Sequence, residues 1–421
     1  MRYLIGMFAL VLALGVSVSA QAEVQNVKVG GDIQIRGITR SNYNLVDKVL
    51  DASWYDSAVR LQISADLSND VGAVVRLINE RDWNATAGGD GTGKEDIALD
   101  LGYITLDNMF GYPVKATLGR QDILFGEGFL IGDGFNGVSN SNLYYGSTES
   151  IRTAFDALRV TYSAAPYTVD LFTAKIHEGF ASSLNGDTNL SGVNVNYAYL
   201  DIATFDLGYF VKLDGNTGST KDNNTKALSL RGEGEIPSIP GLTVKGEYVW
   251  ETGKVITSSN TQDRDANGWY LGAEYALQDN TYQPYFGATY VFLSGEDTTT
   301  NDREQFDALY SDYQDFGTIA SLKGLNDTNL KAWKLTAGLK PTEALSLDIA
   351  YAILNKDETA ATIDDHIANE LDATLTYDYT EDVQFGLSAA WFDSGQYYTD
   401  TYGATYDKTA TQVVGSVKVS F

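Results

Sequence analysis

Apolar and polar residues alternate along much of the chain, and the pattern is clearest at the carboxyl end. From residue 411 onward, every second residue up to the terminal Phe421 is apolar or small, whereas most of the residues between them are polar. Successive side chains of a β-strand point to opposite sides, so this alternation predicts a strand with one apolar face. The same pattern recurs at 59–67, 242–251 and 371–378. We therefore expect an all-β fold.

The chain offers strands and no long apolar helix. After residue 22, no segment approaches the roughly 18 consecutive apolar residues that a membrane-spanning helix requires. A closed barrel is the other structure that satisfies every backbone hydrogen bond inside a membrane. The alternation predicts about eighteen strands, with apolar residues outward and polar residues inward. They are expected to start near residues 27, 55, 71, 95, 113, 155, 166, 191, 203, 226, 241, 267, 281, 331, 344, 369, 382 and 411.

The predicted connections alternate between short and long. Short turns are expected at 68–70, 164–166, 279–280, 341–343 and 380–381, and the long polar segments are 83–94, 122–154, 177–190, 214–225, 252–266, 294–330, 355–368 and 393–410. This alternation is typical of a transmembrane antiparallel β-barrel with short periplasmic turns and long extracellular loops. We predict that residues 23–421 form one such domain. The loop 122–154 is long enough to fold inward and constrict the lumen.

The first 22 residues are typical of a secretory signal peptide. Met1-Arg2 precedes a short apolar run, and Ala20-Gln21-Ala22 supplies the small residues of a cleavage site, so the mature chain is expected to begin at Glu23. With 56 acidic and 29 basic residues, the chain has a formal net charge of −27. Such a surface repels nucleic acid, and no nucleic-acid partner is predicted.

The sequence contains no recognisable arrangement of catalytic or metal-binding residues. The chain has no cysteine, and its two histidines, His177 and His366, fall in predicted loops far from a nucleophile. Acidic loop residues do not follow the spacing of a calcium-binding loop. We predict no enzyme activity, no cofactor and no metal.

Charged residues on the inward parity of the strands provide the candidate lumen lining. Arg36, Arg60, Arg76 and Arg159 cluster in the first part of the chain, and inward acids are frequent in the second half. Facing rows of opposite charge in a water-filled pore act as a selectivity filter. The pattern predicts a lumen with a basic side and an acidic side.

Three stretches resemble the alginate export family of outer-membrane barrels. They are Gly119-Arg120-Gln121-Asp122, Gly126-Glu127-Gly128-Phe129-Leu130-Ile131-Gly132 and Arg152-Thr153-Ala154-Phe155-Asp156-Ala157-Leu158-Arg159. Two later stretches are also similar, one leading from Ser294 to Phe306-Asp307-Ala308-Leu309-Tyr310 and one from Glu370-Leu371-Asp372 to Gly386-Leu387. The resemblance implies an eighteen-stranded barrel with an arginine-lined conduit for an anionic polysaccharide.

The chain departs from the family pattern at three points. Phe129 stands where the family has arginine, and the step from Arg152 to Phe155 is one residue longer. Arg120 shares strand parity with the apolar Leu118, so it points inward only if the strand ends or bulges there.

These observations predict a channel in the bacterial outer membrane for passive passage of a polar, anionic solute. The expected partners are outer-membrane lipid and lipopolysaccharide, the barrel insertion machinery, and an anionic polysaccharide or small anionic solute. Phe421 is the predicted assembly signal. A general small-molecule porin and a non-conducting adhesin or binding protein remain as alternatives. The candidate pore-lining residues are Arg36, Arg60, Arg76, Arg120, Arg152, Arg159, Asp122, Glu127 and Asp156.

The barrel and signal predictions lead to one experiment. We expect the mature protein to begin at Glu23 and to migrate faster in gel electrophoresis before boiling than after it, because a closed hydrogen-bond ladder resists detergent. N-terminal sequencing and electrophoresis of heated and unheated membrane fractions measure both. Recovery of the protein from the soluble periplasm would contradict the barrel.

Overall fold

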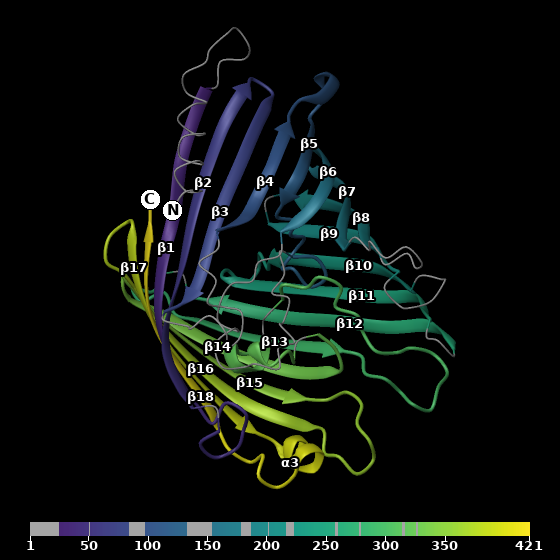
Figure 1. Ribbon diagram of the computed structural model, residues 1–421, viewed down its shortest axis with the longest axis vertical. Helices are drawn as coiled ribbons and strands as arrows, with labels where there is room; N and C mark the ends of the chain where they lie inside the picture. The colour runs from purple at the N-terminus through teal and green to yellow at the C-terminus, as the bar shows by residue number, and fades with distance from the viewer. Residues whose placement is uncertain are drawn as a thin grey trace.

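The computed structural model describes residues 25–49, 51–83, 97–132, 154–177, 187–200, 202–215, 223–256, 260–277, 279–313, 316–325 and 327–421. In this part of the chain, 18 strands form one antiparallel sheet (Figure 1). Each strand pairs with the next, and the last pairs with the first. This closed sheet confirms the predicted barrel of about 18 strands. The predicted signal segment, 1–22, lies outside the described residues.

The strands follow one another around the barrel in chain order and are between 8 and 17 residues long. Their bounds are β1 (Gln25–Ser41), β2 (Ala52–Ser68), β3 (Val71–Asp82), β4 (Ala98–Leu106), β5 (Val114–Gln121), β6 (Phe155–Ala164), β7 (Tyr167–His177), β8 (Thr188–Tyr199), β9 (Ala203–Asp214), β10 (Asn223–Glu235), β11 (Leu242–Ile256), β12 (Thr261–Ala276), β13 (Tyr285–Leu293), β14 (Leu330–Thr342), β15 (Leu345–Asn355), β16 (His366–Asp378), β17 (Val383–Ser394) and β18 (Ala410–Ser420). Connections contain η1 (Met109–Gly111), α2 (Thr318–Leu322) and α3 (Gln396–Tyr402). None of the helices in the described ranges is long and apolar enough to cross a membrane.

The barrel closes where the two ends of the described chain meet (Figure 1). The ladder between β1 and β18 continues past the strands, because Gly31 N–H donates to the carbonyl of Phe421 at 2.9 Å and Phe421 N–H donates back at 3.0 Å. A Cβ atom on residue 31 would lie 2.1 Å from the carbonyl oxygen of Arg60 on β2. Glycine therefore allows β1 to lie between β2 and the carboxyl terminus.

The outer wall of the barrel is apolar. Leu158, Leu171, Leu271, Trp333 and Leu387 are each at least half exposed. They occupy the strand faces that point away from the barrel interior, as the predicted alternation requires. An outward apolar face of this kind is typical of strands that cross a lipid bilayer.

Successive connections lie at opposite ends of the barrel, because consecutive strands are antiparallel. The connections 69–70, 165–166 and 343–344 are short, whereas 122–154 and 294–329 are long. Which end faces the periplasm stays a prediction.

The predicted loop at 252–266 is wrong. β11 and β12 continue through it and leave only 257–260 as the connection. The polar residues there pair across the hairpin: Lys254 lies opposite Asp263 in the ladder, with Nζ 3.5 Å from Oδ1. Facing pairs of opposite charge stabilise a strand pair even where its residues are polar. The polar composition of 252–266 therefore predicted the ends of β11 and β12 wrongly.

The closure predicts the effect of shortening the chain by one residue. Deleting Phe421 removes both backbone hydrogen bonds to Gly31 and the predicted assembly signal, so we expect much less assembled barrel. Phe421→Tyr keeps the backbone and an aromatic ring, and it is expected to assemble normally. The heat-modifiable fraction in isolated outer membranes measures assembly. Unchanged assembly after the deletion would show that the closing strand does not depend on its last residue.

Candidate functional site in the barrel lumen

Arginines from the first three strands line one side of the lumen, each held by acids of a neighbouring strand. Arg36 on β1 forms a two-pronged ion pair with Asp56 on β2, with Nε–Oδ1 and Nη2–Oδ2 both 2.8 Å. Arg60 on β2 binds Asp32 at 2.9 Å and Glu80 at 3.5 Å. Arg36 lies opposite Asp56, and Asp32 lies opposite Arg60, in the β1–β2 register. The ladder itself therefore places the charges in contact.

The row continues on β3 and β6. Arg76 is hydrogen-bonded to Asp100 on β4, and its Nη2 lies 3.7 Å from Asp122. Arg159 on β6 donates to Asp170 on β7 at 2.8 Å. The residues directly before these arginines, Ile35, Val59, Val75 and Leu158, are exposed on the outer face. Strand parity therefore places all four arginines on the lumen side, where each is paired with a carboxylate. The predicted basic side of the lumen carries its own counter-charges.

Arg120 and Asp156 lie elsewhere. They form an ion pair of 3.3 Å between β5 and β6, and the Asp156 side chain is 63% exposed. Asp156 shares its strand face with Leu158 of the outer wall, and Arg120 shares its face with Leu118. Strand parity therefore places this pair outside the lumen, which corrects the predicted pore-lining positions of Arg120 and Asp156. The predicted Arg152 lies outside the described residues.

A cavity of about 400 Å³ opens beside the arginine row, near the short-turn end of β1 to β6. Three basic side chains line it, Lys28, Lys115 and Arg159, together with the acids Asp66 and Asp122. Because Asp122 also contacts Arg76, the cavity adjoins the arginine row directly.

Two long connections fold into the lumen and pair with each other there. Residue 131 of the 122–132 segment forms a parallel bridge with residue 310 of the 294–329 segment. Gly132 N–H donates to the Tyr310 carbonyl at 2.8 Å, and Tyr310 N–H donates to the Leu130 carbonyl at 3.0 Å. A Cβ atom on Gly132 would lie 2.4 Å from that of Asp312, so the contact requires glycine. Residues 122–132, the first part of the loop 122–154 that was predicted to fold inward, therefore lie in the lumen.

Aromatic side chains fill the space between these segments and the wall. Phe129 is 2% exposed, and its ring centre lies 5.2 Å from that of Tyr270 on β12, 6.0 Å from Phe306 and 5.3 Å from Tyr313. Sequence reasoning predicted polar inward faces, yet buried apolar residues occupy that face on many strands where the two segments pack. They include Phe172, Leu190, Phe210, Ala227, Val249, Tyr270, Val291 and Ala332. Phe129, where the family pattern has arginine, suits this apolar surrounding.

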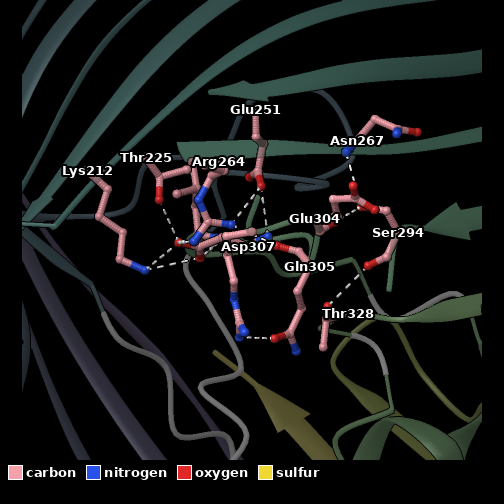
Figure 2. Close-up of polar contacts among 12 residues, drawn as sticks. Lys212, Thr225, Glu251, Arg264, Asn267, Ser294, Glu304, Gln305, Asp307 and Thr328 are labelled. Atoms are coloured by element: carbon pink, nitrogen blue, oxygen red, sulfur yellow. Dashed lines mark hydrogen bonds and ion pairs between the residues drawn. The ribbon is translucent and has the colours of Figure 1, made fainter. Parts of the chain in front are cut away.

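Ion pairs fix both segments to the wall. Glu127 binds Lys245 on β11, with Nζ 2.8 Å from Oε1 and 2.9 Å from Oε2. In the other segment, Asp307 faces wall residues of four adjacent strands (Figure 2). Glu127 was a predicted lumen residue. Asp307 was not among the predicted site residues, because only a stretch that resembles the family contained it.

The Asp307 carboxylate has an unusually complete set of donors. Lys212 Nζ on β9 lies 3.1 Å from Oδ1 and 3.0 Å from Oδ2, and Thr225 on β10 donates to Oδ2 at 3.0 Å. Arg264 Nη2 on β12 is 3.8 Å from Oδ2. Burial alone would raise the pKa of Asp307, but the charges of Lys212 and Arg264 outweigh it and hold that pKa below its usual value. Asp307 is therefore anionic and firmly held.

The backbone of Asp307 is fixed as well. Its N–H donates to Glu251 Oε2 on β11 at 2.9 Å, and the same oxygen accepts from Arg264 Nη1 at 3.3 Å. Arg264 Nη1 also donates to the carbonyl of Gln305 at 2.8 Å. Figure 2 shows Lys212, Thr225, Glu251 and Arg264 of the wall around Asp307.

A third anchor holds α2, which belongs to the same segment. Glu370 on β16 accepts the N–H groups of Ile319 at 2.5 Å and Ala320 at 2.8 Å, and Asp372 accepts the N–H of Thr318 at 2.9 Å. Carboxylates satisfy backbone donors that a helix start leaves unpaired. Here the wall supplies the acid, the reverse of the Glu127 and Asp307 contacts.

Comparison with known sequences identifies the family. A sequence profile described as "Alginate export" matches residues 25–412. The chain belongs to the alginate export family. It is therefore an outer-membrane β-barrel channel, which confirms the predicted family, bacterial outer-membrane location and non-enzymatic class. No curated protein sequence matches the chain.

Solved structures share the fold of this family member. Pseudomonas aeruginosa OprD matches with a TM-score of 0.59 at 11% identity, over 96% of this chain and 98% of that one. Pseudomonas aeruginosa OccK11 matches with a TM-score of 0.58 at 10% identity, over 95% and 98%. Pseudomonas aeruginosa OccK2, solved in complex with glucuronate, has a TM-score of 0.56 at 12% identity, over 95% and 100%. At these identities the likeness concerns the fold.

The contact between the two inner segments is testable because the chain has no cysteine of its own. We expect the pair Ile131→Cys and Tyr310→Cys to form a disulfide on mild oxidation, since paired residues of neighbouring strands lie within bridging distance. A control pair of Ile131→Cys with Thr299→Cys, which lies in an exposed part of the same connection, should stay reduced. Non-reducing electrophoresis and thiol labelling measure the bond. Equal oxidation of both pairs would contradict the paired arrangement.

Proposed function

We propose that this alginate export family member allows passive passage of a polar, anionic solute, either a small carboxylate or an anionic polysaccharide. The observation that carries the proposal is the arginine row beside the lumen cavity, where Lys28, Lys115 and Arg159 face Asp66 and Asp122. Guanidinium groups bind carboxylates through paired hydrogen bonds. One protein of the same fold, Pseudomonas aeruginosa OccK2, was solved in complex with glucuronate, so we choose this sugar acid as the probe.

Local charge, rather than the net charge of −27, is expected to set the ion preference. Charges on exposed loops are screened within about 8 Å at physiological salt. Charges inside a narrow lumen act at short range and with less screening. The acids that pair with Arg36, Arg60 and Arg76 keep these arginines in fixed positions, so the row presents an ordered surface of donors to the solute.

The orientation and context belong to the same proposal. Short turns face the periplasm and long loops face outward, and residues 1–22 are removed so that one barrel domain, 23–421, remains. Lipopolysaccharide and outer-membrane lipid surround the barrel, and the insertion machinery recognises its last strand at Phe421.

Planar bilayer recording tests the ion preference. We expect the purified protein to prefer anions, and Arg159→Ala to reduce that preference because Asp170 then loses its counter-charge. A unit charge 4 Å away contributes about 1 kcal/mol in water, which corresponds to a fall in the anion-to-cation permeability ratio of up to about fivefold. The charge-neutral pair Arg159→Ala with Asp170→Ala should shift the ratio less. Reversal potentials in a salt gradient give the ratio.

Other outcomes decide between the alternatives. Cation preference in the intact protein that Arg159→Ala leaves unchanged would favour a general small-molecule porin. If adding Arg152→Ala to Arg159→Ala has no further effect, Arg152 is not part of the conduit. A folded protein that never conducts would favour an adhesin acting through its loops.

A further inference from the structure

The Asp307 contact has the composition of a carboxylate-binding site that the protein fills with its own side chain. Three of its donors belong to inward faces of barrel strands: Lys212 on β9, Thr225 on β10 and Arg264 on β12. Lys212 reaches both carboxylate oxygens, and Thr225 reaches one of them. The carboxylate itself comes from a connection. These three donors are therefore part of the wall (Figure 2). The acceptor lies on a separate segment, which contributes one donor of its own, the Leu309 N–H at 3.1 Å from Oδ1.

One wall donor, Arg264, is held in place independently of Asp307. Arg264 is only 10% exposed and is also held by Glu251, whose side chain is fully buried. Lys212 lies 5.8 Å from the ring centre of Tyr310 and is 21% exposed. A donor held by other wall residues keeps its geometry when one acceptor is exchanged for another, so an incoming carboxylate meets a preorganised Arg264.

Glu127 repeats the arrangement on β11, the strand between those of Thr225 and Arg264. Its carboxylate, on the 122–132 segment, binds Lys245 of the wall through both oxygens at 2.8 and 2.9 Å. Two separate inner segments thus place an acid on a wall lysine, although the segments differ in sequence and in place along the chain. An anchor with only a structural role does not require the acid on the inner segment and the cation on the wall. The contacts of α2 show this, because there the wall supplies the acids, Glu370 and Asp372, and the inner segment supplies the N–H donors.

We propose that Lys212, Thr225 and Arg264 form a binding site for the carboxylate of the permeating solute, and that Asp307 occupies it as an internal competitor which the solute displaces. This inference rests on the proposed function, because it assumes that an anionic solute enters the lumen. The ligand class follows from the donors: two cations and one hydroxyl converge on a planar acceptor with two oxygens and one negative charge. A neutral sugar of the same size has no such group.

The test measures how D-glucuronate reduces the chloride current through single channels. Asp307→Asn removes the competing charge at almost unchanged size, so we expect half-maximal block at a concentration about tenfold lower than in the unchanged protein. Asp307→Ser is a second, smaller replacement with the same expected direction. Adding Lys212→Gln to Asp307→Asn removes a wall donor and should return the blocking concentration to the original value or above it.

Controls separate the site from general effects. Asp297→Asn changes a partly exposed acid in the same 294–329 connection and should leave the block unchanged. D-glucose, which lacks the carboxylate, should not block any variant in the same concentration range. Heat-modifiable migration establishes that each variant forms a barrel.

The two proposals fail in different ways. If the channel prefers anions but Asp307→Asn and Asp307→Ser leave the glucuronate block unchanged, Asp307 is an anchor only and the inference is overturned. The same holds if Lys212→Gln has no effect in the Asp307→Asn background. Cation preference of the unchanged protein without glucuronate would instead contradict the proposed function.

Discussion

The closed hydrogen-bond ladder is the constraint on which the remaining structure depends. Inside a membrane an unpaired backbone donor has no water to bind, so every strand needs two neighbours and β1 must pair with β18. Closure fixes which side chains face out and which face in, because a shift of one residue would exchange the faces. The closure leaves no space for a side chain at residue 31, since the carboxyl end and β2 both lie against the backbone of Gly31.

A ring of 18 strands is too wide for its own inward side chains to fill. The lumen is therefore organised in two ways. On β1 to β7, Arg36, Arg60, Arg76 and Arg159 pair with acids, most of them on neighbouring strands, and the register of β1 and β2 places two of these pairs directly opposite each other. On the strands that follow, the 122–132 and 294–329 segments supply the missing volume, and inward apolar residues such as Phe210 and Val249 pack against them.

Local periodicity explains what the sequence predicted well. Strand number and parity depend on alternation within about ten residues, so the inward positions of Arg36, Arg60, Arg76 and Arg159 were predictable. Contacts between distant segments were not: Glu127 meets Lys245, and Asp307 meets Lys212, across stretches that no spacing rule connects. Leu190 and Ala227 lie on inward faces and would have signalled the packed segments, as breaks in the expected polar face. Arg120 was predicted to line the pore because of the family motif, although its strand parity with Leu118 indicated the outer face. The structure agrees with the parity.

The ion pairs that hold the inner segments in the lumen have their acids on the segments and their cations on the wall. The wall would therefore expose cations to the lumen if the segments moved away. The inner segments contribute Glu127 and Asp307, while the wall beneath them contributes Lys245, Lys212 and Arg264. Displacing either acid would leave the wall more basic than before, and a buried cation without a partner is costly. An anion entering from solution would relieve that cost, whereas a cation would add to it. If the proposed displacement takes place, the ion pairs that hold the segments inside would also bias the lumen toward anions once they separate.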